Sequence, residues 1–247
     1  MGTDNYYSVK EDVQKYIDGC KTKMNVRTHK VFGRAVLAGM MIAFGASASN
    51  VAAHAVTNVG LSRLVAGCVF PVGLMMVVLL GAELFTGDCL MAMGNAEGAC
   101  TILDLIKFLF VVYVGNFVGS ILLAVVNVIS GQLNYSSGLL GAYTIKVAMG
   151  KVNMSFGQAL CSGILCNILV CAAVLMAMCA RDIVGKLFAC FFTIMLFVVA
   201  GYEHCIANMY YIPAGLIAAR NQNYVQMAMD TYGYTSDQLS SLNLYGF

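Results

Sequence analysis

The chain has 247 residues, of which 60% are hydrophobic and 11% are charged, with a net charge of +2 and a mean hydropathy of +0.79. Soluble domains are typically about half apolar and about a quarter charged, so this composition excludes an ordinary soluble domain. The small positive balance gives no reason to expect a nucleic-acid partner.

Residues 1–30 predict an amphipathic helix beside a membrane. In the stretch "SVKEDVQKYIDGCKTKM", apolar residues recur at helical spacing, and Ser8 with Glu11 forms a capping box. The segment lacks the apolar h-region and the cleavage site of a signal peptide. We expect this helix to lie along the membrane surface or to cover a pore mouth. The alternative is a solvated basic lead-in.

Five apolar stretches follow, each with the roughly 20 residues needed to cross a hydrocarbon core. They lie at about 31–53, 64–93, 104–130, 155–179 and 184–219, and glycine and acidic residues interrupt the second and fifth. No alternating strand pattern occurs, so the sequence predicts one all-α transmembrane domain over residues 31–247. Ten of the 14 Lys and Arg residues fall on the N-terminal side, which predicts a cytoplasmic N-terminus in the cell (inner) membrane.

The two interrupted spans share an internal repeat. "LLGAELFTG" and "VAGYEHCIA" both contain Gly-x-Glu, at Gly81–Glu83 and Gly201–Glu203, 120 residues apart. Corresponding broken helices in two halves indicate a transport site near the membrane midplane. The repeat predicts three inverted spans per half, whereas only five spans are found. We therefore expect a sixth apolar span beyond Phe247.

The breaks also carry acidic residues, although a carboxylate at mid-membrane costs roughly 2.5–3.5 kcal/mol. We expect Glu83 and Glu203 to accept hydrogen bonds from the backbone N–H groups that the breaks free, rather than to contact cargo. The residues assigned to this structural role are Gly81, Glu83, Gly201, Glu203 and Asn208. The helices that resume near Thr86 and near Asn208 would aim their positive ends at the centre and favour an anion.

His204 follows the second break directly. With an ordinary pKa near 6.5, it could donate a hydrogen bond to a passing anion or exchange a proton with it. The alternative is a neutral histidine satisfied by the broken backbone. The ten cysteines form no Cys-x-x-Cys pair, and no nucleophile–base set is evident, so we expect no metal, no cofactor and no enzyme activity.

Four segments resemble a known family. "LLGAELFTG", "GILCNILVCAA", "KVNMSF" and "AGYEHCIANMYYIPAG" resemble signatures of the formate/nitrite transporters, with Ala172 where Leu or Val is usual. Within this family, the sequence as a whole is most similar to the hydrosulfide channel branch. The resemblance implies an aquaporin-like protomer of six helices, with the second and fifth broken. It also implies a homopentamer with one pore per protomer and both termini in the cytoplasm.

The resemblance also assigns residues to the pore. The implied polar contacts are Thr86, Asn167 and His204, and Lys151 would attract anions at the outer vestibule. The implied constrictions are formed by Phe70, Leu74 and Phe197, and by Leu84, Phe85 and Val170. Apolar necks of this kind force an ion to shed its water.

We therefore predict a passive channel for small monovalent anions of weak acids, with hydrosulfide favoured and formate or nitrite also accepted. The alternative is a proton-coupled formate or nitrite symporter. Whether the anion or the neutral acid crosses the necks stays open. A water channel is disfavoured, because neither Pro71 nor Pro213 follows an asparagine.

Overall fold

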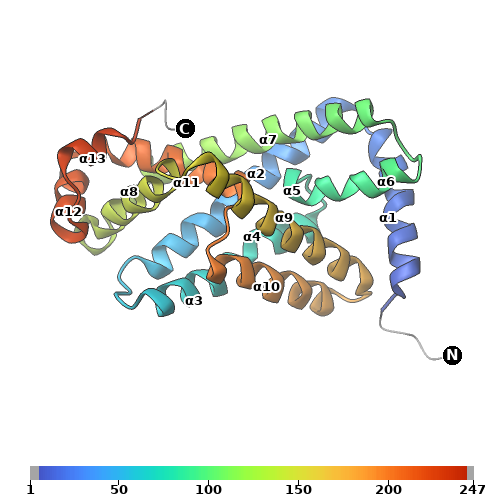
Figure 1. The fold of residues 1–247 in the computed structure, drawn as a ribbon, viewed down its shortest axis with the longest axis horizontal. Coiled ribbons are helices and arrows are strands. Elements are labelled where there is room, and N and C mark those ends of the chain that lie inside the picture. The colour runs from blue at the N-terminus through green and yellow to red at the C-terminus, as the bar shows by residue number, and fades with distance from the viewer. Residues whose placement is uncertain (1–5, 244–247) are drawn as a thin grey trace.

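The computed structural model describes residues 6–243, and nearly all of its regular structure is helical (Figure 1). An isolated antiparallel bridge joins Tyr6 to Ala180. The helices of the first half are α1 (Val9–Met24), α2 (Thr28–Ala53), α3 (Val59–Val69), α4 (Val72–Leu80), α5 (Phe85–Asp88), α6 (Ala92–Ala96) and α7 (Ile102–Ile129). The second half contains α8 (Leu139–Val152), α9 (Phe156–Cys179), α10 (Ile183–Ala200), α11 (Cys205–Ala218), α12 (Gln222–Tyr232) and α13 (Ser236–Ser240). Two 3₁₀ turns, η1 (Cys89–Met91) and η2 (Gln132–Gly138), complete the described elements.

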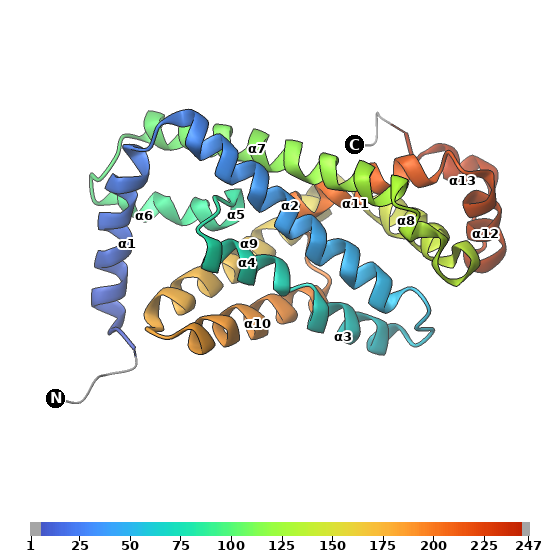
Figure 2. The ribbon, with the colours of Figure 1, turned by 180° about the vertical axis from the view of Figure 1, so that it is seen from behind.

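The molecule is elongated, and its long helices run roughly along its length. Both ribbon views place α1 across one end, while α12 and α13 cap the opposite end (Figures 1 and 2). We call these the α1 end and the α12 end. Helix α1 begins at the Ser8–Glu11 capping box that the sequence predicts.

Five helical stretches within residues 6–243 are long and apolar enough to cross a membrane. They are Thr28–Ala53, Val59–Leu80, Ile102–Ile129, Phe156–Cys179 and Ile183–Ala200, and α11 is a shorter apolar helix. The stretches expected at 64–93 and 184–219 are divided here: the first contains most of Val59–Leu80 with α5, and the second contains most of Ile183–Ala200 with α11. Helices α8 and α12 were not predicted, because with 14 and 11 residues they are too short to mark a span. They form because they pack on each other and on α11 around a core that includes Leu140, Ile145 and Tyr224.

Small residues let α2 and α7 pack closely. A Cβ added to Gly39 would collide with the Asn116 backbone, and one added to Gly119 would collide with the backbone carbonyl of Val36. This contact explains the Gly-x-x-x-Gly pair at Gly115 and Gly119, a spacing that favours close helix approach. The tight pairing brings Asn116 within reach of the first broken span.

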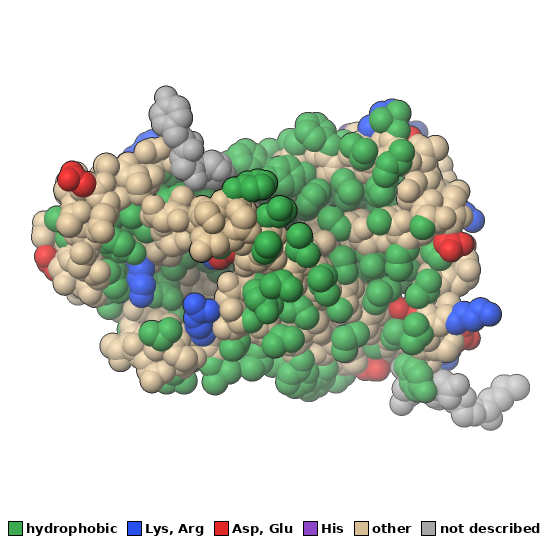
Figure 3. All heavy atoms as spheres, viewed as in Figure 1, with side chains coloured by type: hydrophobic (Ala, Val, Ile, Leu, Met, Phe, Trp, Pro, Cys, Tyr) green, Lys and Arg blue, Asp and Glu red, His purple; other side chains and the backbone are tan. Residues whose placement is uncertain are grey.

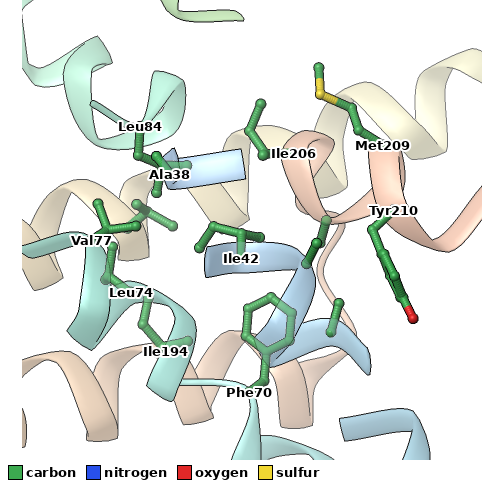
Figure 4. Close-up of a cluster of buried hydrophobic side chains, with 14 of the residues drawn as sticks. Ala38, Ile42, Phe70, Leu74, Val77, Leu84, Ile194, Ile206, Met209 and Tyr210 are labelled. Atoms are coloured by element: carbon green, nitrogen blue, oxygen red, sulfur yellow. The ribbon is translucent and has the colours of Figure 1, made fainter. Parts of the chain in front are cut away.

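The main core lies between the broken helices and α2. Figure 4 shows its side chains converging from several elements. Members include Ala38, Ile42, Phe70, Leu74, Val77, Leu84, Ile194, Ile206, Met209 and Tyr210. The outer faces of the long helices are instead apolar and exposed, as the side chains of Phe110, Phe156 and Phe192 illustrate. Figure 3 shows hydrophobic side chains over the middle of this surface and most charged ones towards the two ends, which is the distribution a membrane-embedded protein requires.

Candidate functional site

The helices are interrupted twice inside the molecule, at two matching gaps. Helix α4 ends at Leu80, Gly81 takes a left-handed φ of 68°, and α5 begins at Phe85. In the second half α10 ends at Ala200, Gly201 takes a φ of 78°, and α11 begins at Cys205. Glycine adopts this φ without strain, which explains why a glycine stands at the same place in both copies of the repeat.

Two details differ from the expectation at these gaps. The second downstream helix begins at Cys205, three residues before Asn208. After the first gap, α5 has only four residues and continues through η1 into α6. The positive helix end near Thr86 is therefore weaker than an uninterrupted half-helix would provide.

Neutral side chains, not the glutamates, satisfy the gap backbone. The side-chain oxygen of Asn116 accepts from Phe85 N at 2.9 Å, and its amide nitrogen donates to Glu83 O at 3.0 Å and to Ala35 O at 2.7 Å. In the second gap, Glu203 N donates to Ser162 Oγ at 2.9 Å. The carboxylates of Glu83 and Glu203 were predicted to accept from this backbone, but at these groups the partners are Asn116 and Ser162. Both polar residues lie within apolar spans, a signal that could have identified them.

Each of the two glutamates instead forms an ion pair with a lysine. Lys23 Nζ lies 2.6 Å from a Glu83 oxygen and 2.5 Å from an Asp88 oxygen. Lys151 Nζ lies 2.6 and 2.8 Å from the two carboxylate oxygens of Glu203. An Arg34 nitrogen lies 3.8 Å from Glu83, and the side-chain amide of Asn208 donates to Glu203 at 2.9 Å.

Lys23 and Lys151 are equivalent by position. Each is the second-last residue of the helix that precedes the first span of its half, α1 or α8. Burial alone would lower the pKa of Lys23, but the charges of Asp88 and Glu83 outweigh it, and the pKa lies well above its ordinary value. Lys23 is therefore cationic throughout the physiological pH range. Lys23 was not among the predicted site residues, although its 128-residue offset from Lys151 is close to the 120-residue spacing of the repeat.

The two gaps meet at a threonine–histidine pair. Thr86 Oγ1 and His204 Nε2 are 3.0 Å apart, and both side chains are buried. His204 Nδ1 accepts from the Ala207 N–H at 3.1 Å and so caps α11. Because Nδ1 accepts, the neutral ring carries its proton on Nε2 and donates to Thr86. The hydroxyl proton of Thr86 is then free to donate elsewhere.

Aromatic rings enclose this pair. The Phe197 ring is stacked on the His204 imidazole with centroids 5.8 Å apart, and the Phe70 ring meets Phe197 edge-on at 5.6 Å. Leu74, Leu84 and Val170 belong to the same buried core. The structure thus brings together most of the residues predicted to form the constrictions.

Asn167 and Phe85 lie to one side of this centre. Both line a groove of about 690 Å³ along α9, which Thr86 and Cys205 also border. Phe85 packs edge-on against Tyr113 at 5.1 Å. Asn167 Nδ2 lies 3.8 Å from Cys171 Sγ, and its side-chain oxygen has no hydrogen-bond partner among the described residues.

A cavity of about 240 Å³ leads from the core to the α1 end. It is lined by Leu74 and Leu84 at one side and by Lys23, Glu83 and Asp88 at the other. Helix α1 covers it with Tyr16, Gly19 and Cys20. Within residues 6–243, no group of three or more His, Cys, Asp or Glu side chains could hold a metal ion.

The sequence model of the Formate/nitrite transporter family matches residues 10–236. The chain belongs to the formate/nitrite transporter family. The formate channel FocA of Haemophilus influenzae is 37% identical over 230 residues, which cover 91% of this chain and 79% of that protein. FocA of Escherichia coli K12 is 36% identical over 190 residues, covering 76% of this chain and 67% of that protein.

A solved structure has the same fold. A pentameric formate channel with formate bound superposes with a TM-score of 0.81 at 32% identity, covering 89% of this chain and 86% of that chain. Together with its apolar helices, this relationship makes this family member a multi-pass membrane protein. Its relatives are named as channels and transporters rather than enzymes.

Proposed function

We propose that this family member is a passive channel for small monovalent anions of weak acids. The observation that carries the proposal is the Thr86–His204 pair, which joins the two gaps beside the Phe70 and Phe197 rings. A desolvated anion needs hydrogen-bond donors, and this pair offers two: the free hydroxyl proton of Thr86, and the Nε2–H of His204 when the anion replaces Thr86 as its acceptor. The relatives named as formate channels support an anionic cargo.

The path begins at charged ends and narrows at the centre. Lys151 attracts anions at the α12 end, while the cavity at the α1 end presents Lys23 beside two carboxylates. The phenylalanine rings force the anion to shed water, which costs free energy unless donors replace it. Thr86, His204 and Asn167 are proposed to supply these donors. Leu74, Leu84, Phe85 and Val170 are proposed to keep the neck dry.

The geometry at His204 favours passage of the anion itself. A neutral imidazole donates a hydrogen bond through Nε2–H but has no proton to give away without becoming an anion. Cationic His204 would need a proton on Nδ1, where the ring now accepts from Ala207 N. Proton transfer at this site would therefore disrupt the cap of α11, whereas hydrogen-bond donation leaves it intact.

Purified protein in liposomes tests both the cargo and the mechanism. We expect influx of formate, nitrite and hydrosulfide, with hydrosulfide the favoured member of the set, and an anion current when a voltage is applied. Liposomes lacking the protein serve as the control. Anion uptake with no current at any voltage would identify electroneutral proton symport instead, and the absence of uptake for every anion would defeat the proposal.

We further propose a homopentamer with a cytoplasmic N-terminus. A pentameric relative supports the assembly. In its most apolar window α9 is 17% buried whereas α2 is 50% buried, so α9 offers apolar surface to lipid or to a neighbouring subunit. Light scattering of the purified protein should give the mass of five chains. A reporter fused to the N-terminus should report the cytoplasm, and an external report would overturn this orientation.

A further inference from the structure

A second hollow lies at the α12 end, apart from the threonine–histidine pair. It measures about 580 Å³ and is bordered by residues after α2, the start of α3, and parts of α8 and α12. Its lining includes Arg63, Lys146, Tyr143 and Tyr232, and no carboxylate. Figure 3 shows basic side chains at a depression between the α8–α12 lobe and α3. We call it the basic hollow.

Neutral partners hold both cations of the basic hollow. The Arg63 guanidinium packs against Gly201, and one nitrogen lies 3.5 Å from Val199 O. The Lys146 ammonium lies over the Tyr232 ring, 4.6 Å from its centroid, and 5.5 Å from that of Tyr143. No ion pair in residues 6–243 involves either cation. Both side chains are exposed, so their positive charge faces solvent uncompensated.

The charges along the path are paired everywhere except in the basic hollow. Lys23 contacts the carboxylates of Glu83 and Asp88, and Lys151 contacts that of Glu203. Arg63 and Lys146 form no such pair, and no carboxylate lines the hollow. The basic hollow therefore places two unpaired positive charges near the second gap.

The basic hollow also joins the second gap directly. Arg63 lies against Gly201, where α10 ends, and Gly201 is two residues before Glu203 and three before His204. A small anion held by Arg63 and Lys146 would thus lie beside the second gap. Clefts lined by one sign of charge raise the local concentration of the opposite ion and its association rate.

We propose that Arg63 and Lys146 form an anion-collecting site that binds small inorganic or carboxylate monoanions before they enter the channel. The hydroxyl groups of Ser62 and Tyr143 line the same hollow and can add hydrogen bonds to the ion. The site rests on the proposed function for its role, but its binding property can be measured separately. An anionic lipid headgroup has the same chemistry, and the experiment separates the two.

Iodide quenching of fluorescence measures anion accumulation in the hollow without any transport. The chain contains no tryptophan, so Tyr232→Trp places a single reporter ring beside Lys146. In vesicles of neutral phosphatidylcholine at low ionic strength, we expect iodide to quench this reporter more strongly than neutral acrylamide does. Combining the reporter with Arg63→Gln and Lys146→Gln should lower the iodide-to-acrylamide ratio about three-fold or more. At 1 M salt, where screening acts within about 3 Å, the two proteins should give the same ratio.

Two further variants separate charge from structure. Arg63→Lys with Lys146→Arg keeps both charges and should keep the ratio, whereas Arg220→Gln removes a basic residue outside the hollow and should leave it unchanged. An unchanged ratio in the Arg63→Gln/Lys146→Gln protein, or a decrease that persists at 1 M salt, overturns the proposal. Loss of the iodide excess when anionic lipid is added would show that headgroups occupy the hollow, which also overturns it.

Formate influx through the same proteins reports on the role of the site. At low ionic strength, the Arg63→Gln/Lys146→Gln variant should raise the apparent KM for influx from the α12 side about three-fold or more, with the maximal rate unchanged. If the protein with Arg63 and Lys146 intact carries no anion, the proposed function fails while the quenching result still stands. If the intact protein and the Arg63→Gln/Lys146→Gln variant carry formate with the same KM, the collecting role is contradicted while the proposed channel function still holds.

Discussion

Replacing His204 with leucine should reduce anion flux about ten- to one hundred-fold. The leucine fills a similar volume beside the Phe70 and Phe197 rings but leaves the neck with one donor fewer and Thr86 without its partner. A hydrogen bond to a charged group is worth about 1.5–3 kcal/mol, and each 1.4 kcal/mol changes a rate about ten-fold. Stopped-flow influx of formate into liposomes measures the effect.

Two other variants make this result interpretable. His29→Leu changes an exposed histidine at the start of α2 and should leave flux unaltered. His204→Asn keeps a short polar side chain that can cap α11 and donate at the neck, so it should retain more flux than leucine. Flux in the His204→Leu protein within two-fold of the unaltered protein would show that the anion does not contact the histidine.

Replacing Asn116 with leucine should destabilise the protein by about 2–5 kcal/mol. The change leaves Phe85 N and Glu83 O without their hydrogen bonds, in a region where Asn116 itself is fully buried. Each buried polar group left unsatisfied costs about 1–3 kcal/mol. Because these groups belong to the first gap, the mobility of residues 81–84 should increase as well. The unfolding free energy in detergent measures the loss.

Ser120→Ala is the matched control for Asn116. Ser120 lies one helical turn further along α7 and is equally buried, but its hydroxyl makes a single 3.2 Å bond to Gly39 O. Its removal should cost about 1 kcal/mol, the value of an ordinary hydrogen bond. Equal stability of the leucine and alanine proteins would mean that Asn116 does not hold the gap.

The spans and both gaps could be predicted because their signals are local. A run of apolar residues identifies a membrane helix by itself, and Gly81 and Gly201 mark the interruptions through the one backbone conformation that favours glycine. The Gly-x-Glu motif at both places then indicated that the two gaps correspond to each other. Hydrophobicity could not identify α8, because its helix is stabilised by packing on α11 and α12 rather than by a continuous apolar run.

The partners of the buried charges could not be predicted, because they depend on how distant segments pack. Glu83 lies 60 residues from Lys23, and Glu203 lies 52 residues from Lys151. A carboxylate beside a helix break is compatible with capping the backbone or with pairing to a cation. The choice depended on Asn116 and Ser162, whose side chains already satisfy the freed backbone groups.

The matching positions of Lys23 and Lys151 change how the N-terminal segment is viewed. Helix α1 occupies in the first half the place that α8 occupies in the second, and each brings a lysine to a glutamate of its gap. A protein that lacks residues 1–24 would keep Glu83 and Asp88 buried without Lys23, and only the more distant Arg34 would lie near Glu83. Trimming this segment to improve expression would therefore remove a counter-charge on which the first broken span depends.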